Sequence, residues 1–494
     1  MTKNCAFNFL MLAALTKYVR AFGGAHRYSP GTSLVGRGIA DAALYEPAES
    51  IELGQRLSDP TLLKTNAFIG GTWVDTGSAF DVKDPANGAI IAAVSSCGPN
   101  EVAVALSAAE SAGTAWAKTS AKERGRILHR WFELMHSHAQ DIATILTFEA
   151  GKPFAESLGE IAYAASFFEW FAEEAKRMNG QTIPAPTTNR RLLTIKQPVG
   201  VAALITPWNF PAAMITRKVG PCIASGSSAV VKPAEDTPLT ALALAELGSR
   251  AGIPPGLLSV LPTPRCAAAQ VGEMLCKHPI VRKVSFTGST GVGITLGNWC
   301  SASVKRTSFE LGGNAPFIVF HDADLNTAVD ALMASKFRNS GQTCVCANRV
   351  LVQSQILDPF VSAVKARMEK IKLGHGINDG TTQGPLINAA GRMKVERHVK
   401  DALEKGGKLL MGGKSPGGNF WEPTLIVGAN TEMECFKEEQ FGPLLAIASF
   451  DTEEEAITIA NDCEVGLAGY FCSKDLDRVW RVAEALETGM VGGE

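Results

Sequence analysis

The hydrophobic and polar positions divide most of the chain into alternating strand-like and helical segments. Short alternating runs broken by Gly-Gly, Thr-Gly and Ala-Asn-Gly begin at Ala67 and predict a small antiparallel β element. Helical spacing of apolar residues then predicts three helices: Asn100–Trp116, Ala121–Glu149 and Ala155–Met178. The third helix has an aromatic face, which we interpret as core packing rather than as a ligand site.

A regular alternation of strands and helices follows Arg190–Gly200, a segment that we expect to be an exposed strand ending in a proline turn. The predicted strands are Val201–Thr206, Ser228–Lys232, Leu257–Leu261, Lys283–Thr287 and Ala315–Phe320, with helices such as Leu239–Ala251 between them. This alternation predicts a parallel sheet covered on both faces, with ligands at the carboxyl ends of its strands. The alternation resumes after Lys336 and predicts a second α/β domain, through Ile356–Leu373, Ala389–Lys405, Leu409–Met411 and Glu453–Ile459.

The composition is that of an ordinary globular protein of 494 residues, 46% hydrophobic and 19% charged, with a net charge of −2. Near-neutrality argues against a nucleic-acid partner, which needs a concentrated basic face. No run approaches the roughly 18–20 apolar residues of a membrane span. The eleven cysteines lack the C-x-x-C spacing of zinc sites, which predicts no metal site, reduced thiols and an intracellular compartment.

The first 40 residues contain no Asp or Glu but carry several Lys and Arg residues. This composition is typical of an organellar transit peptide, which we place at residues 1–45, and it predicts the mitochondrial matrix. The alternatives are a secretory signal, because Ala6–Leu15 is a short, mostly apolar run, and a disordered or spurious extension. A secreted destination would expose a reactive thiol to oxidation, which favours the matrix.

One segment, Lys336–Arg349 or KFRNSGQTCVCANR, is the main site candidate. Cys344 follows a Gly-Gln-Thr turn and is flanked in sequence by Arg338 and Arg349. Positive charges lower the pKa of a thiol, and thiolate is the nucleophile that needs least activation. The alternatives are a small buried hydrophobic residue and a fragment of a metal site.

Two motifs at strand ends indicate a nucleotide site. Thr287–Gly293, TGSTGVG, follows a strand and opens a helix, an arrangement that binds anions through free N–H groups and the helix dipole. Lys232 and Glu235 lie at the end of another strand, where a carboxylate accepts ribose hydroxyls and repels a 2′-phosphate. This favours NAD over NADP. The alternative for Thr287–Gly293 is an ordinary strand-to-helix turn, and the alternative for Lys232 and Glu235 is a surface ion pair.

Two further motifs carry groups suited to acyl chemistry. In Thr206–Pro211, TPWNFP, a stiff turn fixes the Asn209 amide as a donor for an oxyanion; the alternative is an asparagine that bonds its own backbone. Trp208 fits packing or a wall of a substrate tunnel. Glu310 lies between Phe309 and Leu311, so we expect partial desolvation that raises its pKa and makes it a general base for water. The alternative is a solvated loop acid.

With EEQFGP at 438–443, these motifs in this order and spacing resemble the aldehyde dehydrogenase superfamily, from about Ala67 to the last residues. KQPVGVAALITPWNFP, AMITRKVGP, KPAEDTP and SKFRNSGQTCVCAN are similar to its succinate-semialdehyde branch. The resemblance implies an α/β fold with a Rossmann-type NAD-binding domain (46–183 and 201–312). It also implies a bridging and oligomerisation β element (184–200) and an α/β catalytic domain (313–494).

The resemblance also implies the chemistry. Cys344 attacks an aldehyde to give a thiohemiacetal, whose oxyanion is held by the Asn209 amide and the Cys344 N–H. Hydride transfer to the nicotinamide leaves a thioester, and Glu310 activates the water that releases the acid. The implied cofactor-binding residues are Thr206, Trp208, Lys232, Glu235, Gly288, Ser289, Gly293, Glu439 and Phe441.

Two further implied roles concern the substrate and redox control. Arg217 and Arg338 match a pair that grips the distal carboxylate of the substrate, for which a planar guanidinium is suited; the alternative is surface charge. Cys346 resembles a redox partner of the nucleophile, and a Cys344–Cys346 disulfide would block the thiolate reversibly.

The chain ends at Glu494, whereas members of the superfamily continue. From this ending we expect a splice variant, a fragment or a misplaced terminus that lacks part of the catalytic domain. The ending alone does not decide whether such a chain is active or forms the family's homotetramer. The predicted function is NAD-dependent oxidation of succinate semialdehyde to succinate, as in 4-aminobutyrate degradation. The alternatives are a related substrate such as glutarate semialdehyde and a catalytically silent chain that associates with full-length subunits.

Overall fold

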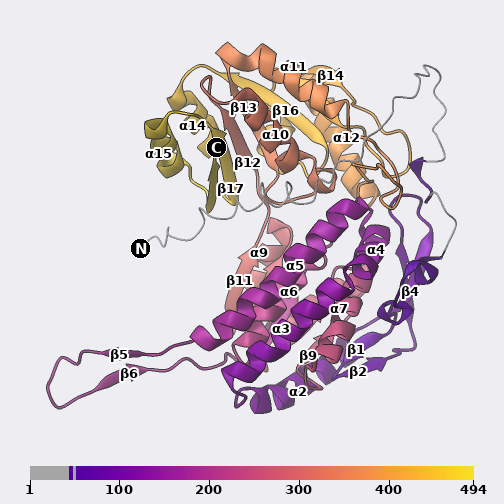
Figure 1. Cartoon of the computed structure of the whole chain (residues 1–494), viewed down its shortest axis with the longest axis vertical. Helices are drawn as coiled ribbons and strands as arrows, with labels where there is room; N and C mark the ends of the chain where they lie inside the picture. Colours follow the sequence, from indigo (N-terminus) through magenta and orange to yellow (C-terminus); the bar gives the residue numbers. More distant parts are fainter. Residues whose placement is uncertain (1–43, 48–51) are drawn as a thin grey trace. The chain divides into compact units, whose positions relative to one another are not determined.

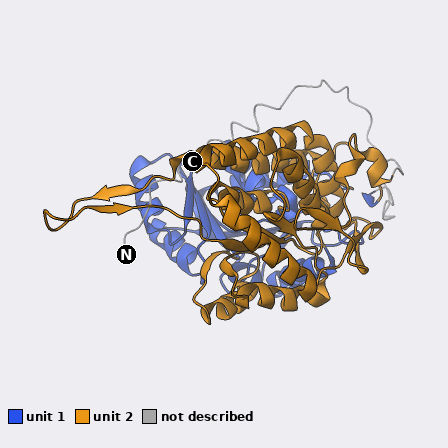
Figure 2. Ribbon diagram, turned by 90° about the horizontal axis from the view of Figure 1, so that it is seen from below, with its two compact units in different colours: residues 1–45, 312–374, 388–494 blue, residues 46–311, 375–387 orange. Residues whose placement is uncertain are grey.

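The computed structural model describes residues 44–47 and 52–494, and the chain divides into two units (Figure 2). The described part of unit 1 consists of residues 44–45, 312–374 and 388–494, and that of unit 2 of residues 46–47, 52–311 and 375–387. The predicted transit peptide lies outside the described residues, except for residues 44–45.

Unit 2 is built on a sheet with the strand order β11-β10-β7-β8-β9-β1-β2. The first five strands in this order are parallel, and β1 and β2 extend the sheet as an antiparallel hairpin. Four of the five predicted strands lie in this sheet, whereas the predicted strand Ala315–Phe320 belongs to the sheet of unit 1 and β11 takes the fifth parallel place. The strands are β1 Ala67–Ile69, β2 Thr72–Val74, β7 Val201–Ile205, β8 Ser228–Lys232, β9 Leu258–Val260, β10 Val281–Thr287 and β11 Arg306–Glu310.

Helices cover both faces of this sheet (Figure 1). Along β7 the side chains alternate: Ala202 and Leu204 pack with α3 to α7, whereas Ala203 and Ile205 pack on the other face with α2, α8 and α9. The helices are α2 Pro99–Trp116, α3 Ala121–Ser137, α4 Ala139–Ala150, α5 Phe154–Glu174, α6 Ala213–Ala224, α7 Pro238–Ala251, α8 Arg265–Lys277 and α9 Thr290–Ser301. The prediction of a sheet covered on both faces is confirmed.

Two predicted elements of unit 2 are wrong in extent. The single helix Ala121–Glu149 is broken at His138, whose backbone leaves the helical conformation (φ −110°, ψ 19°) and whose ring nitrogen lies 2.9 Å from the Leu134 carbonyl oxygen. Within Arg190–Gly200, only β6 (Leu192–Thr194) is a strand. It pairs with β5 (Gln181–Ile183) in a hairpin that extends away from the helices of this unit (Figure 1).

The remaining elements of unit 2 are short. A third antiparallel pair consists of β3 and β4, and three 3₁₀ turns lie before β1 and after α5. Their bounds are β3 Ala79–Lys83, β4 Ile90–Ser95, η2 Leu53–Arg56, η3 Pro60–Leu62 and η4 Ala175–Arg177.

Unit 1 contains the second α/β sheet, in the order β14-β15-β16-β13-β12-β17-β18, and only β14 in it is antiparallel to its neighbour. Val350 and Val352 of β13 pack with Leu332 of α10 and Phe360 of α11, so these two helices cover one face. The strands are β12 Ala315–Val319, β13 Ala347–Gln353, β14 Lys408–Met411, β15 Thr424–Val427, β16 Leu444–Phe450, β17 Ala468–Cys472 and β18 Met490–Gly493. The helices are α10 Leu325–Lys336, η5 Arg338–Gly341, η6 Ser354–Ile356, α11 Leu357–Met368, α12 Ala389–Glu404, α13 Glu434–Lys437, α14 Glu453–Asn461 and α15 Leu476–Ala485.

Candidate active site

Cys344 lies on the loop between α10 and β13 of unit 1, with a partly exposed side chain. The preceding Asn339, Ser340 and Gly341 have left-handed backbones, with φ of 51°, 55° and 76°. Such a conformation costs a non-glycine residue about 1–3 kcal/mol, so surrounding contacts must hold the loop. A Cβ on Gly341 would lie 2.2 Å from the carbonyl oxygen of Gly442, so the loop passes too closely there for a side chain. The predicted nucleophile is therefore on a strained, tightly packed loop.

Two contacts fix the backbone around Cys344. The hydroxyl of Tyr470 donates to the carbonyl oxygen of Val345 at 2.8 Å. On the other side, a Cβ on Gly313 would lie 2.3 Å from the carbonyl oxygen of Cys344, and the Gly313 N–H donates to Glu439 at 3.0 Å. Unit 1 thus brings Cys344 and Glu439, both predicted from sequence, to either side of one glycine. Tyr470 was not predicted, because a tyrosine inside an apolar strand resembles any core residue.

The turn that carries Glu439 and Phe441 is tied to the end of α10. Burial raises the pKa of Glu439, against the opposing effect of the Lys394 charge, and Phe441 adopts a left-handed backbone with φ of 57°. Between them, buried Gln440 accepts a hydrogen bond from the ammonium of Lys336 at 2.7 Å. Lys336 is itself fully buried, and burial lowers its pKa. Lys336 begins the candidate segment Lys336–Arg349, but the sequence analysis assigned no role to it.

The two arginines that flank Cys344 in sequence have different roles. Arg349 is 2% exposed, and its guanidinium donates to the carbonyl oxygens of Asn314, Ile459 and Ala460 at 2.7–3.0 Å. It therefore anchors β13, and its expected effect on the Cys344 thiol stays a prediction. Arg338 is half-buried, and its charge lowers the pKa of Cys346 against the larger raising effect of burial.

Cys346 is buried and directed away from solvent. Its thiol donates to the carbonyl oxygens of Ser335 and Lys336 at 3.1 and 3.2 Å, and burial raises its pKa. Cys344 and Cys346 are both free thiols in this structure. Their proposed disulfide stays a prediction.

In unit 2, the turn after β7 holds Asn209, which is 5% exposed. The backbone carbonyl of Asn209 accepts a hydrogen bond from the ammonium of Lys152 at 2.9 Å. Phe210 is buried in the core, whereas Trp208 is partly exposed. The hydroxyl of Thr206 is buried, and no partner for it is found within residues 44–47 and 52–494. The turn therefore presents a buried hydroxyl without a protein partner at the carboxyl end of β7.

The helix that follows carries two adjacent cations. Arg217 is half-buried, with its guanidinium carbon 5.1 Å from the centroid of the Phe167 ring. Lys218 is buried and its ammonium donates to the Ser285 hydroxyl at 2.9 Å. Burial lowers the pKa of Lys218 to about 8, while the negative charge of Glu310 raises it. The sequence analysis did not single out Lys218, although its charge interacts with that of Glu310, the predicted base, within unit 2.

Glu310 ends the edge strand β11, opposite Thr287 of β10, and its side chain is exposed. We expected partial desolvation from the apolar neighbours Phe309 and Leu311. That expectation is wrong, because an edge strand has a neighbour on one side only and the last residue of β11 faces solvent.

The end of β8 carries the predicted ribose site. The Lys232 ammonium is buried, lies 3.7 Å from a carboxylate oxygen of Glu235 and donates to the carbonyl oxygen of Pro233 at 3.0 Å. Burial lowers the pKa of Lys232. The neighbouring Asp236 is partly exposed, and desolvation together with the Glu235 charge raises its pKa to about 6. Two partly exposed carboxylates, Glu235 and Asp236, therefore lie at this strand end, and Glu235 is the one beside the Lys232 ammonium.

The glycine-rich turn after β10 fits a phosphate group. Gly288 is followed by Ser289, the N-cap of α9, whose side chain makes no capping hydrogen bond. A Cβ on Gly293 would lie 2.4 Å from Leu311, so glycine lets α9 pack against the strand end. The Thr287 hydroxyl is buried and, within the described part of the chain, has no partner. An uncapped helix N-terminus with buried donors beside it suits the phosphates of a dinucleotide.

The predicted site residues divide between the units. Unit 1 holds Arg338, Cys344, Cys346, Glu439 and Phe441, and unit 2 holds Thr206, Trp208, Asn209, Arg217, Lys232, Glu235, Gly288, Ser289, Gly293 and Glu310. The placement of Cys344 toward Asn209 and Glu310 therefore stays a prediction.

Unit 2 also buries acids that the sequence did not single out. Glu149 is 0% exposed and accepts hydrogen bonds from the N–H groups of Leu239 and Thr240 at 2.7 and 2.9 Å, at the start of α7. Burial raises its pKa to about 8. The sequence does hold a signal for this buried acid, because Glu149 lies within the mostly apolar segment Ile145–Ala150.

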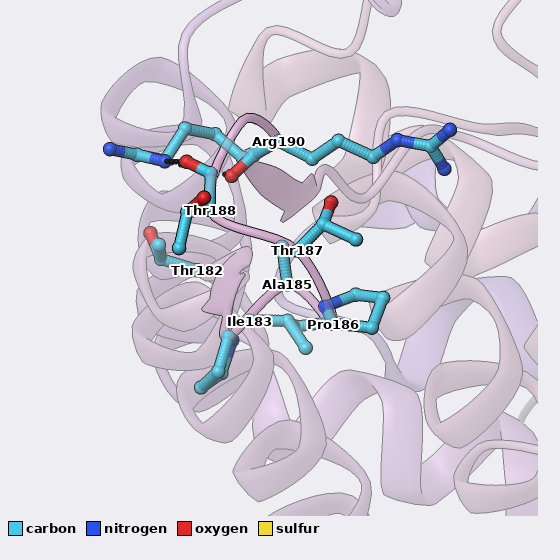
Figure 3. Close-up of a pocket in the computed structure, with 9 residues that line it drawn as sticks. Thr182, Ile183, Ala185, Pro186, Thr187, Thr188 and Arg190 are labelled. Atoms are coloured by element: carbon cyan, nitrogen blue, oxygen red, sulfur yellow. Dashed lines mark hydrogen bonds between the residues drawn. The ribbon is translucent and has the colours of Figure 1, made fainter.

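A hollow of about 450 Å³ lies elsewhere, in the loop of the β5–β6 hairpin (Figure 3). Residues 182–188, Arg190 and Arg191 line it, and the Arg191 guanidinium donates to the carbonyl oxygen of Thr188 at 3.1 Å. None of the predicted site residues lines this hollow, so we assign it no catalytic role. Among the described residues, no helix has both the length and the apolar character to cross a membrane.

The two units define an α/β protein with a partly exposed cysteine on a strained loop and a strand edge suited to a dinucleotide. Residues 73–493 match the model of the aldehyde dehydrogenase family. The chain therefore belongs to the aldehyde dehydrogenase family.

Individual relatives are similar over most of their length. The mitochondrial succinate-semialdehyde dehydrogenase of Homo sapiens is 54% identical over 434 residues, which are 87% of this chain and 81% of that protein. The NADP(+) succinate-semialdehyde dehydrogenase GabD of Escherichia coli is 52% identical over 441 residues, 88% and 91% of the two chains. The crystal structure of succinate-semialdehyde dehydrogenase from Burkholderia pseudomallei is 52% identical, with a TM-score of 0.87 over 88% of this chain and 91% of that one.

Proposed function

We propose that this chain oxidises succinate semialdehyde to succinate with NAD. The observation that carries the proposal is the 54% identity to the human succinate-semialdehyde dehydrogenase over 87% of the chain. The strained loop that presents Cys344 supports it, because a reactive thiol is the group that this chemistry requires.

The Cys344 thiolate attacks the aldehyde carbon, so that a C–S bond forms and the carbonyl electrons move to oxygen. The Asn209 amide and the Cys344 N–H donate hydrogen bonds to that oxyanion. NAD would supply the hydride acceptor; once the same carbon had lost its hydride, Cys344 would carry the acyl group as a thioester. Glu310 then removes a proton from water, whose oxygen attacks the thioester; the C–S bond breaks and succinate leaves.

The distal carboxylate of the substrate is held by Arg217 and Arg338. A guanidinium donates two parallel hydrogen bonds to a carboxylate, which fixes the orientation of the substrate as well as its affinity. Both side chains are half-buried, so a salt bridge to either one is screened less than a surface pair.

For the cofactor, Lys232 and Glu235 hold the adenosine ribose, and Ser289 with the N-terminus of α9 holds a phosphate. Glu439 and Phe441 hold the nicotinamide half. A carboxylate at position 235 accepts ribose hydroxyls and repels a 2′-phosphate, which supports NAD over NADP. The E. coli relative is named for NADP(+), so the choice of cofactor needs its own measurement.

Three further proposals follow. From the composition of the first 40 residues we infer a mitochondrial matrix location. From the resemblance we infer a homotetramer, and we infer that oxidation of Cys346 with Cys344 inactivates the enzyme reversibly. Size-exclusion chromatography tests the tetramer. Loss of activity with mild peroxide, restored by a thiol reductant, tests the switch, and unchanged activity after peroxide contradicts it.

The function is tested by following NADH absorbance with the purified chain and three aldehydes: succinate semialdehyde, glutarate semialdehyde and a neutral aldehyde of equal length. We expect the highest kcat/KM with succinate semialdehyde and no rate for Cys344→Ala. A higher kcat/KM with glutarate semialdehyde would support that substrate instead. No turnover with any of the three would support the catalytically silent chain and contradict the proposal.

A further inference from the structure

Lys152 and Glu160 form an ion pair inside unit 2 and are 2% and 3% exposed. Lys152 precedes α5, and Glu160 lies on the second turn of that helix. Burial of an ion pair is costly unless further hydrogen bonds satisfy both groups. Both members of this pair have partners in one short segment, the turn after β7 and the start of α6.

The lysine contacts the middle of the turn. Its ammonium donates to the backbone carbonyl of Asn209 at 2.9 Å and lies 3.9 Å from the centroid of the Phe210 ring. A cation over an aromatic face is attractive, most strongly where water is excluded. Lys152 therefore holds the backbone of the residue whose amide we assign to the oxyanion, together with the aromatic side chain that follows it.

The glutamate contacts the other end of the same segment. One carboxylate oxygen of Glu160 accepts hydrogen bonds from the N–H groups of Ala212 and Ala213, at 2.9 and 3.3 Å. These N–H groups lie at the start of α6, where donors lack partners within the helix and a negative charge is favourable. Glu160 thus fixes the residues immediately after the second proline of the turn.

We propose that Lys152 and Glu160 are positioning residues that aim the Asn209 amide at the oxyanion. The pair contacts the turn on both sides of Pro211, so neither end of the Asn209–Ala213 segment can shift without breaking a bond to a buried charge. This inference rests on the proposed function, because Asn209 has the oxyanion role only there. A pair that only stabilised the fold would have no specific effect on the chemical step.

Hydrogen exchange of backbone amides tests the anchoring without any need for turnover. In Lys152→Met, which keeps the chain length and removes the charge, we expect exchange at residues 208–210 to be at least tenfold faster. In Glu160→Gln we expect the same at Ala212 and Ala213. The matched control is Glu149→Gln, which alters another buried acid and should speed exchange at the start of α7 only. Unchanged exchange at residues 208–213 in both pair variants would overturn the proposal.

A double-mutant cycle tests the link to chemistry. We expect Lys152→Met to lower kcat at least tenfold and to change the KM for the aldehyde less than threefold. In an Asn209→Ala background the same change should lower kcat less than twofold, because the amide to be positioned is already absent. An equal factor in both backgrounds would show a purely structural role and overturn the proposal.

The variant Lys152→Met with Glu160→Gln separates stability from positioning. It leaves no unpaired buried charge, so its thermal midpoint should return toward that of the wild type while kcat stays low. If Lys152→Met alone does not fold, this double variant replaces it in the kcat and hydrogen-exchange measurements. Recovery of kcat together with stability contradicts positioning. Suppose that exchange at residues 208–213 is faster in the pair variants but the wild-type chain oxidises none of the three aldehydes. That result would support the anchoring of the turn by Lys152 and Glu160 and would contradict the proposed function.

Discussion

Replacement of Gly313 by alanine should displace the loop that carries Cys344. A Cβ at this position would lie 2.3 Å from the carbonyl oxygen of Cys344, whereas non-bonded carbon and oxygen atoms rarely approach closer than about 3.4 Å. The backbone must therefore move by about 1 Å. The φ angle of Gly313 is not in the left-handed region, so the effect is a displacement rather than backbone strain.

A misplacement of about 1 Å at a reacting group costs on the order of 100-fold in rate. We therefore expect Gly313→Ala to lower kcat by about that factor and to slow alkylation of Cys344 by iodoacetamide. The matched control is Gly159→Ala, where a Cβ meets nothing within 4 Å. A folded Gly313→Ala variant with kcat within threefold of the control would refute the reasoning that this contact sets the position of the nucleophile.

Three further predictions concern pH, substrate and cofactor. The folded protein holds the Glu149 proton up to about pH 8, whereas the unfolded chain releases it near the ordinary pKa of 4.5. The free energy of unfolding should therefore fall by up to about 5 kcal/mol between these pH values. Glu149→Gln should remove that part of the slope in urea unfolding, and an identical slope would contradict the assignment. Arg338→Ala should raise the KM for succinate semialdehyde by about 10–100-fold, from loss of a charge-assisted hydrogen bond worth about 1.5–3 kcal/mol. The KM for a neutral aldehyde of equal length should change much less, and equal effects on both would remove the proposed role. Glu235→Ser should raise kcat/KM with NADP relative to NAD at least tenfold, and an unchanged ratio would show that Glu235 does not select the cofactor.

The hydrophobic pattern predicted the strands of the parallel sheets because each strand is recognisable from its own residues. Val201–Ile205 is apolar throughout and buried on both faces, and an apolar run between turn residues is typical of such a strand. The break at His138 was not predictable in the same way. The helical pattern continues through it, and the backbone departs where the imidazole lies against the carbonyl of Leu134.

The predicted site residues were those in sequence motifs, whereas the residues that support them were missed. Cys344 stands in a recognisable turn, but the residues that hold its loop and the Asn209 turn are far away in sequence. Lys152 is 57 residues from Asn209, and Tyr470 is 125 residues from Val345. Their roles depend on contacts that only the folded chain creates.

One expectation was wrong because it used neighbours in sequence. Glu310 was expected to be desolvated by Phe309 and Leu311. Glu310 lies at the exposed end of an edge strand. Burial and charge are properties of the surrounding fold, and sequence neighbours do not determine them.

The central claim is that Cys344 forms the covalent intermediate, and acid quenching during turnover tests it most directly. The Glu310→Gln variant should hydrolyse the thioester slowly, so the intermediate accumulates with succinate semialdehyde and NAD. Mass spectrometry of the digested protein should then find a succinyl group on Cys344 and on no other cysteine. A succinyl group on Cys346 or another residue, or NADH formation in the Cys344→Ala variant, would contradict the account.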